Sequence, residues 1–211
     1  MQSESEQTVF VVDDDEDIRT SLSRALKTRG YATRTFGSAH EFLDAYDPEL
    51  SGCLILDYGM PEMSGLDLQR ALVARGASLP IIFITGHGGV PESVQAMKLG
   101  AVDFLEKPFR QEVLIKQIDA ALKLDAQARQ GRNRARDARR RFENLTERER
   151  EIAELLVSNP SSSSSKDVAR QLDISPRTVD HHRARILEKM RVNSVAELVD
   201  LSITTHLFEK S

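Results

Sequence analysis

The sequence predicts an α/β domain with a parallel, doubly wound sheet, followed by a small domain made only of helices. Residues 1–124 alternate short apolar runs with amphipathic stretches, which is the pattern of a mostly parallel sheet covered by helices. After residue 141 the chain has helix start signals and no comparable alternation. A length of 211 residues allows one large domain or two small ones and excludes a multidomain machine.

Five apolar runs are expected to form the strands of the sheet. The first, third and fourth are nearly continuous, as expected for strands covered by helices on both faces. The second contains Thr33, Arg34 and Thr35, so we place it at an edge of the sheet. The expected strands are residues 8–12, 31–36, 53–56, 80–84 and 102–105.

A helix is expected from Gln111, with an apolar stripe that fades after Leu124. Residues 125–141 carry seven arginines. We interpret this segment as a solvated helical linker that Gly131 could break, although a basic stretch would also suit a phosphate backbone. The expected domains are therefore residues 1–124 and 142–211, joined by 125–141.

The helices of the second domain are predicted from their capping residues. Thr146 and Glu149 have the spacing of a capping box, which starts a helix through residue 157. The run Ser161–Ser165 is too polar to pack, and we expect a flexible loop that ends with Ser165 as the N-cap of helix 166–172. Two further helices are expected at residues 176–190, after Ser175, and after Ser194.

Composition limits the classes of function. The net charge is −4, but residues 1–124 carry −7 and residues 125–211 carry +3. A single Cys excludes an intramolecular disulfide and a Cys-cluster metal site. No N-terminal apolar segment suits secretion and no apolar run is long enough to cross a bilayer, so we expect a cytoplasmic protein without a membrane partner.

Polar residues follow the predicted strands at one edge of the sheet. Three aspartates, 13 to 15, come after the first strand, Asp57 after the third, Thr85 after the fourth, and Lys107-Pro108 after the fifth. Ligands of open α/β sheets bind at this edge. One such Asp alone would be a helix cap or a turn residue, but four strand ends that present acids, a hydroxyl and an ammonium together indicate a site.

Clustered carboxylates repel one another, so a cation is expected among them, and oxygen ligands suit Mg²⁺, or Mn²⁺ in its place. A metal beside a carboxylate and a Lys is also typical of phosphoryl transfer. Asp57 is the best candidate for the nucleophile.

Four motifs in this half resemble the receiver domain of bacterial two-component response regulators: VFVVDDDEDIR, CLILDYGMPEMSG, FITGHG and FLEKPF. The resemblance implies a flavodoxin-like fold and a phosphoryl group donated to Asp57 by a histidine kinase. It also implies that Asp13, Asp14, Asp57 and the backbone carbonyl of Gly59 hold the metal.

The same resemblance assigns further roles. Thr85 and Lys107 would bind the phosphoryl group, with a cis peptide before Pro108. Phe104 would be a switch residue, although a Phe on a strand is ordinarily part of the core. Asp15 is left as a helix cap, and His87 as a residue that tunes hydrolysis of the phosphate.

The second domain has the lengths and spacing of a helix-turn-helix, in which helices 166–172 and 176–190 flank a short turn. On a helical wheel the second helix buries Val179, His182, Ile186 and Met190. Its outer face carries Arg177, His181, Ala184, Arg185 and Glu188. An isolated helix with such a face would be interpreted as merely solvated.

The segments NLTEREREIAELL and KDVARQLDISPRTVDHHRARILEKMRVNSVAELV resemble the LuxR-type helix-turn-helix, and the whole chain is similar to the NarL/FixJ class of response regulators. By this resemblance helix 176–190 lies in the DNA major groove, with Asp180, His181 and Ala184 facing base edges. His182 would be structural. The candidates for phosphate contacts are Lys166, Arg177, Thr178, Arg183, Arg185 and Lys189.

Two departures limit this resemblance. The loop before Lys166 is about three residues longer than the usual Gly-x-x-Asn-Lys connection of the family. Asp180 stands where a Lys is common. An acid there would repel phosphates but could accept a hydrogen bond from cytosine N4.

The resemblance implies a DNA-binding regulator that dimerises on phosphorylation, with a sensor histidine kinase, promoter DNA and RNA polymerase as partners. It would not be an enzyme beyond transfer and loss of its own phosphoryl group. Two alternatives stay open. Asp13-x-Asp15 imitates the nucleophile motif of haloacid-dehalogenase-type phosphatases, and a receiver with a degenerate tail could act as a protein-binding adaptor.

Overall fold

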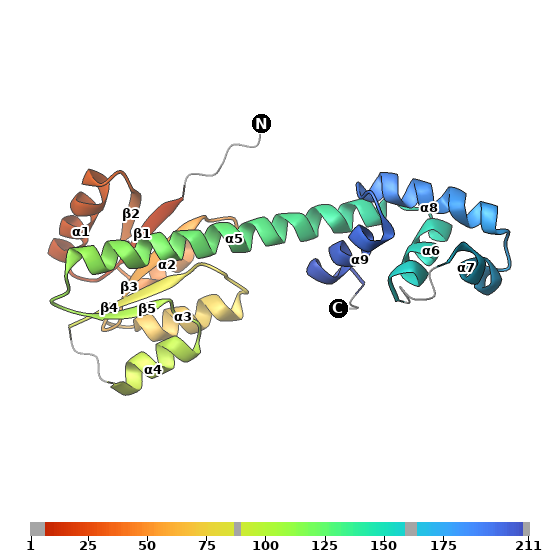
Figure 1. The fold of residues 1–211 in the computed structure, drawn as a ribbon. Coiled ribbons are helices and arrows are strands. Elements are labelled where there is room, and N and C mark those ends of the chain that lie inside the picture. The colour runs from red at the N-terminus through yellow and green to blue at the C-terminus, as the bar shows by residue number, and fades with distance from the viewer. Residues whose placement is uncertain (1–6, 87–89, 159–163, 209–211) are drawn as a thin grey trace. The chain divides into compact units, whose positions relative to one another are not determined.

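The computed structural model describes residues 7–86, 90–158 and 164–208 (Figure 1). Its contacts divide the chain into two compact units, Met1–Ala128 and Arg129–Ser211, which are described separately. His87 and Ser161–Ser163, which carried expectations above, lie outside the described residues.

The first unit is built on a parallel sheet, as the alternating pattern predicts. Within the described residues the strands lie in the order β2-β1-β3-β4-β5 and all neighbours pair in parallel. Every predicted strand is found within one residue of its expected ends, and the polar strand β2 lies at an edge, as predicted. The strands are β1 (Thr8–Val12), β2 (Ala32–Phe36), β3 (Gly52–Asp57), β4 (Ile81–Thr85) and β5 (Asp103–Glu106).

Helices cover both faces of this sheet (Figure 1). Alternate residues of each strand point to opposite faces, so two cores form. Phe10, Leu54 and Phe83 pack with the side of α2, α3 and α4, while Val11 and Ile55 pack with the side of α1 and α5. The helices are α1 (Glu16–Thr28), α2 (Ala39–Ala45), α3 (Gly65–Ala74), α4 (Val90–Lys98) and α5 (Gln111–Glu143).

The helix α5 is continuous through Gly131, so the prediction that this glycine could break it is wrong. One glycine in a helix interior costs only about 1 kcal/mol relative to alanine, and the helix formers on either side outweigh that cost. Ala138, which we assigned to a solvated linker, is buried.

Asp125 of α5 is also buried, with 1% of its surface exposed, although the sequence placed it in the linker. Its Oδ2 accepts hydrogen bonds from the amide of Gly52 at 2.9 Å and from the hydroxyl of Ser51 at 3.0 Å. Gly52 has a φ of +141°, and a Cβ there would lie 1.7 Å from the carbonyl oxygen of Thr8. The start of β3 therefore requires glycine, and Asp125 joins α5 to it.

The second unit contains only helices among its described residues, as predicted. Leu145, Ile152, Val179, Ile186 and Leu198 belong to one buried core. The elements are α6 (Glu147–Ser158), α7 (Ser165–Leu172), α8 (Pro176–Met190) and α9 (Val195–Thr204).

Most of the predicted caps of this unit are confirmed. The capping box is reciprocal, since Glu149 accepts from the amide of Thr146 and donates its own amide to the Thr146 hydroxyl. Ser175 and Ser194 cap α8 and α9. At α7 the expectation was wrong by one residue: Ser164 accepts from the amide of Asp167, and Ser165 is the first residue of the helix.

None of the helices in the described ranges combines the length and the apolar character needed to cross a membrane.

Replacing Asp125 with alanine should lower the free energy of unfolding of the first unit by about 2–3 kcal/mol, because the buried amide of Gly52 and the hydroxyl of Ser51 lose their acceptor. Urea unfolding followed by circular dichroism measures the change. Glu112→Ala, which removes an exposed acid of the same helix, should cost less than about 0.5 kcal/mol. Equal losses in the two variants would show that Asp125 does not anchor the helix.

Candidate functional site

Side chains from several strand ends meet at the carboxyl edge of the sheet. Asp13 follows β1, while Asp57 and Thr85 are the last residues of β3 and β4 rather than the residues after them. The exposed fractions of these three residues are only 1%, 6% and 2%. Because β1, β3 and β4 are neighbours in the sheet, residues distant in the sequence lie together here.

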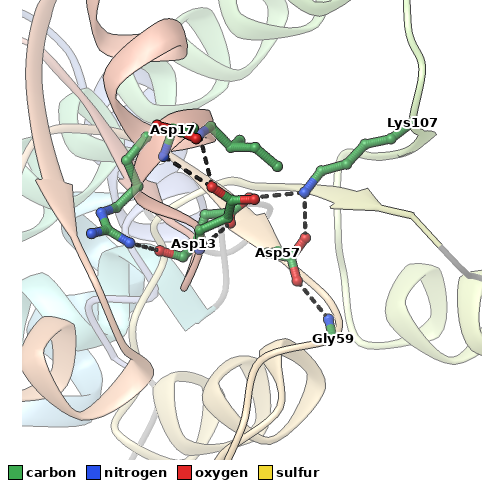
Figure 2. A network of polar contacts seen from close by, with 8 residues as sticks. Asp13, Asp17, Asp57, Gly59 and Lys107 are labelled. Atoms are coloured by element: carbon green, nitrogen blue, oxygen red, sulfur yellow. Dashed lines mark hydrogen bonds and ion pairs between the residues drawn. The ribbon is translucent and has the colours of Figure 1, made fainter.

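Lys107, which follows β5, bridges the two buried acids (Figure 2). Its Nζ lies 2.9 Å from Oδ2 of Asp13 and 2.8 Å from Oδ1 of Asp57. Burial lowers the pKa of Lys107, but the hydrogen bonds and charges of both aspartates outweigh it and leave that pKa raised. The peptide between Lys107 and Pro108 is cis, as the family resemblance implies.

Burial raises the pKa of Asp13, and the nearby charge of Asp57 raises it further, while Lys107 and the amide of Asp15 oppose the shift. Asp13 is thus a buried carboxyl group whose ionic partner is Lys107. Its Oδ1 accepts from the amide of Asp15 at 2.9 Å. Arg19, which the sequence did not single out, donates to the backbone oxygen of Asp13 at 2.7 Å.

The backbone around Asp57 fixes the orientation of its carboxylate. The amide of Gly59 donates to Oδ2 at 2.8 Å, while Oδ1 accepts from Lys107 (Figure 2). A Cβ on Gly65 would lie 2.3 Å from the backbone oxygen of Asp57. Glycine at the start of α3 thus permits the close approach that holds the loop after β3 in place.

The other two aspartates after β1, Asp14 and Asp15, are both exposed. Asp15 caps α1 by accepting from the amides of Asp17 and Ile18, as expected. The described residues contain no group of three His, Cys, Asp or Glu side chains that could hold a metal. The structure thus brings together Asp13, Asp57 and Lys107.

The oxygens at this edge fit a hard divalent cation. Mg²⁺ is usually bound by one or two carboxylates together with waters and other oxygens, and Asp13 and Asp57 are two buried carboxylates that share a single ammonium. Burial is the main cause of the raised pKa of Asp13, and Lys107 opposes it.

Phe104 of β5 is half-buried, and its ring centroid lies 6.0 Å from those of Tyr58 and Phe83. It packs against the core on the α3–α4 side of the sheet. Neighbouring strands place Phe83 opposite Phe104 and Thr85 opposite Glu106. The ring of Phe104 therefore has a packing role. Its strand partner Phe83 lies two residues before Thr85 on β4.

The helical wheel of α8 is confirmed for its apolar side. Val179, Ile186 and Met190 are buried, whereas His182 is half-buried and its Nδ1 has no hydrogen-bond partner among the described residues. The predicted outer residues Arg177, His181, Ala184, Arg185 and Glu188 are all exposed.

Two further candidates on α8 have partners within the protein. The hydroxyls of Thr178 and Ser175 are hydrogen-bonded to each other at 2.7 Å. Lys189, expected to contact phosphate, instead lies with its Nζ 2.5 Å from Oε2 of Glu149, whose side chain is 1% exposed. The wheel places Lys189 beside Met190 and Ile186, so its stem follows the core and its ammonium reaches a buried acid on α6.

Glu149 serves the capping box and this ion pair at once. Burial raises the pKa of Glu149, but hydrogen bonds from Lys189 and Thr146 outweigh burial and leave that pKa lowered. The ion pair therefore stabilises the fold above the ordinary pKa of a glutamate and loses that effect as the pH falls.

The five-stranded parallel sheet carries two acids bridged by a lysine at its carboxyl edge, and a helix-turn-helix follows later in the chain. Together these features define a class of protein that combines a receiver with a DNA-binding domain. Residues 9–119 match the response regulator receiver domain, and residues 143–202 match the luxR family of bacterial regulatory proteins. The chain belongs to the response regulators that carry a LuxR-type DNA-binding domain.

Several relatives match nearly the whole chain. Response regulator protein TodT of Pseudomonas putida is 42% identical over 93% of this chain and 86% of its own length. Transcriptional regulatory protein FixJ of Rhizobium meliloti is 43% identical over 93% of this chain and 95% of its own length. The structure of response regulator StyR has a TM-score of 0.83 and 41% identity, and covers 94% of this chain and 99% of that one.

These relatives are named as response or transcriptional regulators, which does not support the phosphatase alternative. The position of Asp15 agrees with this, because the second acid of the imitated motif caps a helix outside the cluster. The match to the luxR family likewise does not support a degenerate helical tail.

Lys189→Met should lower the free energy of unfolding of the second unit by about 2–3 kcal/mol at pH 7, because Glu149 would stay buried without its cation. The difference from the unchanged protein should shrink as the pH falls from the ordinary glutamate pKa of 4.5 through the lowered pKa of the folded protein, since below that pKa Glu149 is protonated in both proteins. Urea unfolding at neutral and acidic pH measures it. Lys166→Met, at an exposed lysine, serves as the control, and a loss that persists undiminished in acid would contradict the ion-pair explanation.

Proposed function

We propose that this protein accepts a phosphoryl group from a sensor histidine kinase on Asp57, dimerises, and regulates transcription by binding promoter DNA. The observation that carries the first step is the position of Lys107, whose ammonium reaches both Asp57 and Asp13. The proposed receiver domain is residues 1–124, the linker 125–141, and the DNA-binding domain 142–211.

The residues around Asp57 suit an in-line attack on phosphorus. One carboxylate oxygen is held by Lys107 and the other by the amide of Gly59, so the nucleophile is oriented before the donor arrives. Lys107 and the hydroxyl of Thr85 would neutralise the phosphoryl oxygens. Asp13, Asp14, Asp57 and the carbonyl of Gly59 would hold Mg²⁺ or Mn²⁺, which supplies further positive charge when bound.

Phosphorylation would then rearrange the charges of the site. The phosphoryl group adds negative charge and acceptor oxygens beside Lys107, which now divides its ammonium between two aspartates. We propose that Lys107 and Thr85 move toward these oxygens, and that the half-buried ring of Phe104 adjusts its packing in response. Beyond transfer and hydrolysis of its own phosphoryl group the protein would have no enzymatic activity.

For DNA binding, we propose that α8 enters the major groove with Asp180, His181 and Ala184 at base edges. Promoter DNA, RNA polymerase and a second copy of the chain would be its partners, and the cytoplasm its compartment. The proposed phosphate contacts are Lys166, Arg177, Thr178, Arg183 and Arg185.

The charge of the DNA-binding domain supports control by dimerisation. Residues 142–211 hold 10 basic and 12 acidic side chains, a net charge of −2. Such a domain gains little from general attraction to DNA and must depend on a few placed cations. Pairing two copies doubles those contacts, so affinity should follow association.

Replacing Asp57 with asparagine should abolish phosphoryl uptake, because an amide has no nucleophilic oxygen anion. Incubation with radiolabelled acetyl phosphate and Mg²⁺ measures the incorporated phosphate per chain. Asp44→Asn, at a residue of α2 away from the strand ends, is the control and should label normally. Stoichiometric labelling of the Asp57 variant would refute the assignment.

Replacing Arg177 with alanine should weaken binding to all DNA sequences alike and reduce the slope of log K against log salt by about 1, since one phosphate contact is lost. Fluorescence anisotropy at several salt concentrations measures the slope. Arg75→Ala in the first unit should leave the slope unchanged. A loss confined to one base position would instead show that Arg177 reads sequence.

A further inference from the structure

The hydroxyl of Ser165 donates a hydrogen bond to Oδ1 of Asp180. Ser165 is the half-buried first residue of α7, and Asp180 is an exposed residue of α8. Both residues belong to the departures from the family pattern noted above, the serine run before Lys166 and the acid in place of a lysine. The contact joins α7 to α8, the two helices of the helix-turn-helix.

Ser165 is available for this contact because another serine performs the cap. Ser164 accepts from the amide of Asp167 and also hydrogen-bonds its carboxylate, so the N-terminus of α7 is capped without Ser165. No ion pair involving Asp180 is formed within the described ranges. One oxygen of Asp180 is therefore held by a neutral donor, the hydroxyl of Ser165.

We propose that Ser165 is a positioning residue for sequence recognition: its hydroxyl holds one oxygen of Asp180 so that the other is presented to the major groove as a fixed acceptor for the amino group of one cytosine. This inference rests on the proposed function of α8 as the reading helix.

The chemistry of the base edges favours cytosine. Guanine presents two acceptors, N7 and O6, and thymine presents the acceptor O4 beside a methyl group, so both disfavour a carboxylate. Adenine presents a donor next to the acceptor N7, which suits an amide better than an acid. Cytosine presents the N4 donor with no adjacent acceptor, and a carboxylate oxygen matches it.

Holding Asp180 matters because an exposed carboxylate is otherwise free to rotate. Ordering one side chain on binding costs about 0.5–1.5 kcal/mol, which corresponds to about two- to tenfold in affinity. In this protein the contact with Ser165 orders Asp180 before DNA binds.

The test uses the full chain, with and without acetyl phosphate, and a duplex library with randomised bases. Selection with the unchanged protein and with Asp180→Ala identifies the base position whose cytosine preference depends on Asp180. Dissociation constants for duplexes with each base at that position are then measured for Ser165→Ala, Ser165→Thr and Ser164→Ala. Binding to unrelated DNA and its salt slope are measured for all variants.

Ser165→Ala should lower the cytosine preference at that position by about three- to tenfold, with unchanged binding to unrelated DNA. Ser165→Thr keeps the hydroxyl and should keep the preference. Ser164→Ala loses the cap and should lower the melting temperature without changing the preference.

Three outcomes would overturn the inference. The first is full cytosine preference in Ser165→Ala, and the second is an equal loss at every base position, which would indicate only a structural role. The third is a selected sequence that does not change with Asp180→Ala, which would also remove Asp180 from the base contacts. Failure of the unchanged protein to bind any duplex would instead contradict the proposed function itself.

Discussion

The ion pairs of Lys107 with two buried carboxylates are the interaction on which the phosphoacceptor site depends. Asp13 and Asp57 lie at the ends of adjacent strands, and two neighbouring charges removed from water repel each other strongly. The ammonium of Lys107 makes their burial tolerable, at 2.9 and 2.8 Å. Two buried carboxyl groups therefore share one ammonium at this edge of the sheet.

Two other buried carboxylates of the described residues also combine a backbone donor with a side-chain partner. Asp125 accepts from the backbone of Gly52 and from Ser51, and Glu149 completes a capping box while it pairs with Lys189. Backbone amides likewise hold Asp13 and Asp57 in place. Lys107 reaches these two acids through a long flexible side chain, so its ammonium can change partners while the backbone contacts and the fold remain.

The charges of the second unit lead to a similar division of roles on α8. Lys189 is committed to Glu149 on the inner side, while Arg177 and Arg185 remain exposed on the outer side. Because the domain as a whole carries slightly more acid than base, attraction to DNA must come from placed side chains rather than from net charge. In our proposal Asp180 reads one base on this surface while Ser165 holds its carboxylate.

The sequence by itself determined the local structure and indicated which strand ends carry the polar residues of the site. Alternating apolar runs predicted the strands to within a residue, capping residues predicted the helix starts, and the polar residues after the strands predicted which side chains would gather at one edge. These signals act over a few neighbouring residues or follow from the order of strands in a parallel sheet, so they can be followed along the chain.

Only the tertiary structure decided which partner each polar side chain finds. Asp125 and Lys189 looked like linker and surface residues, yet one holds the start of β3 and the other a buried glutamate. Asp14 is exposed whereas its neighbour Asp13 is buried, and Gly131 does not interrupt α5. Such outcomes depend on residues tens of positions away, and on whether burial leaves a charge in need of compensation, which no local pattern records.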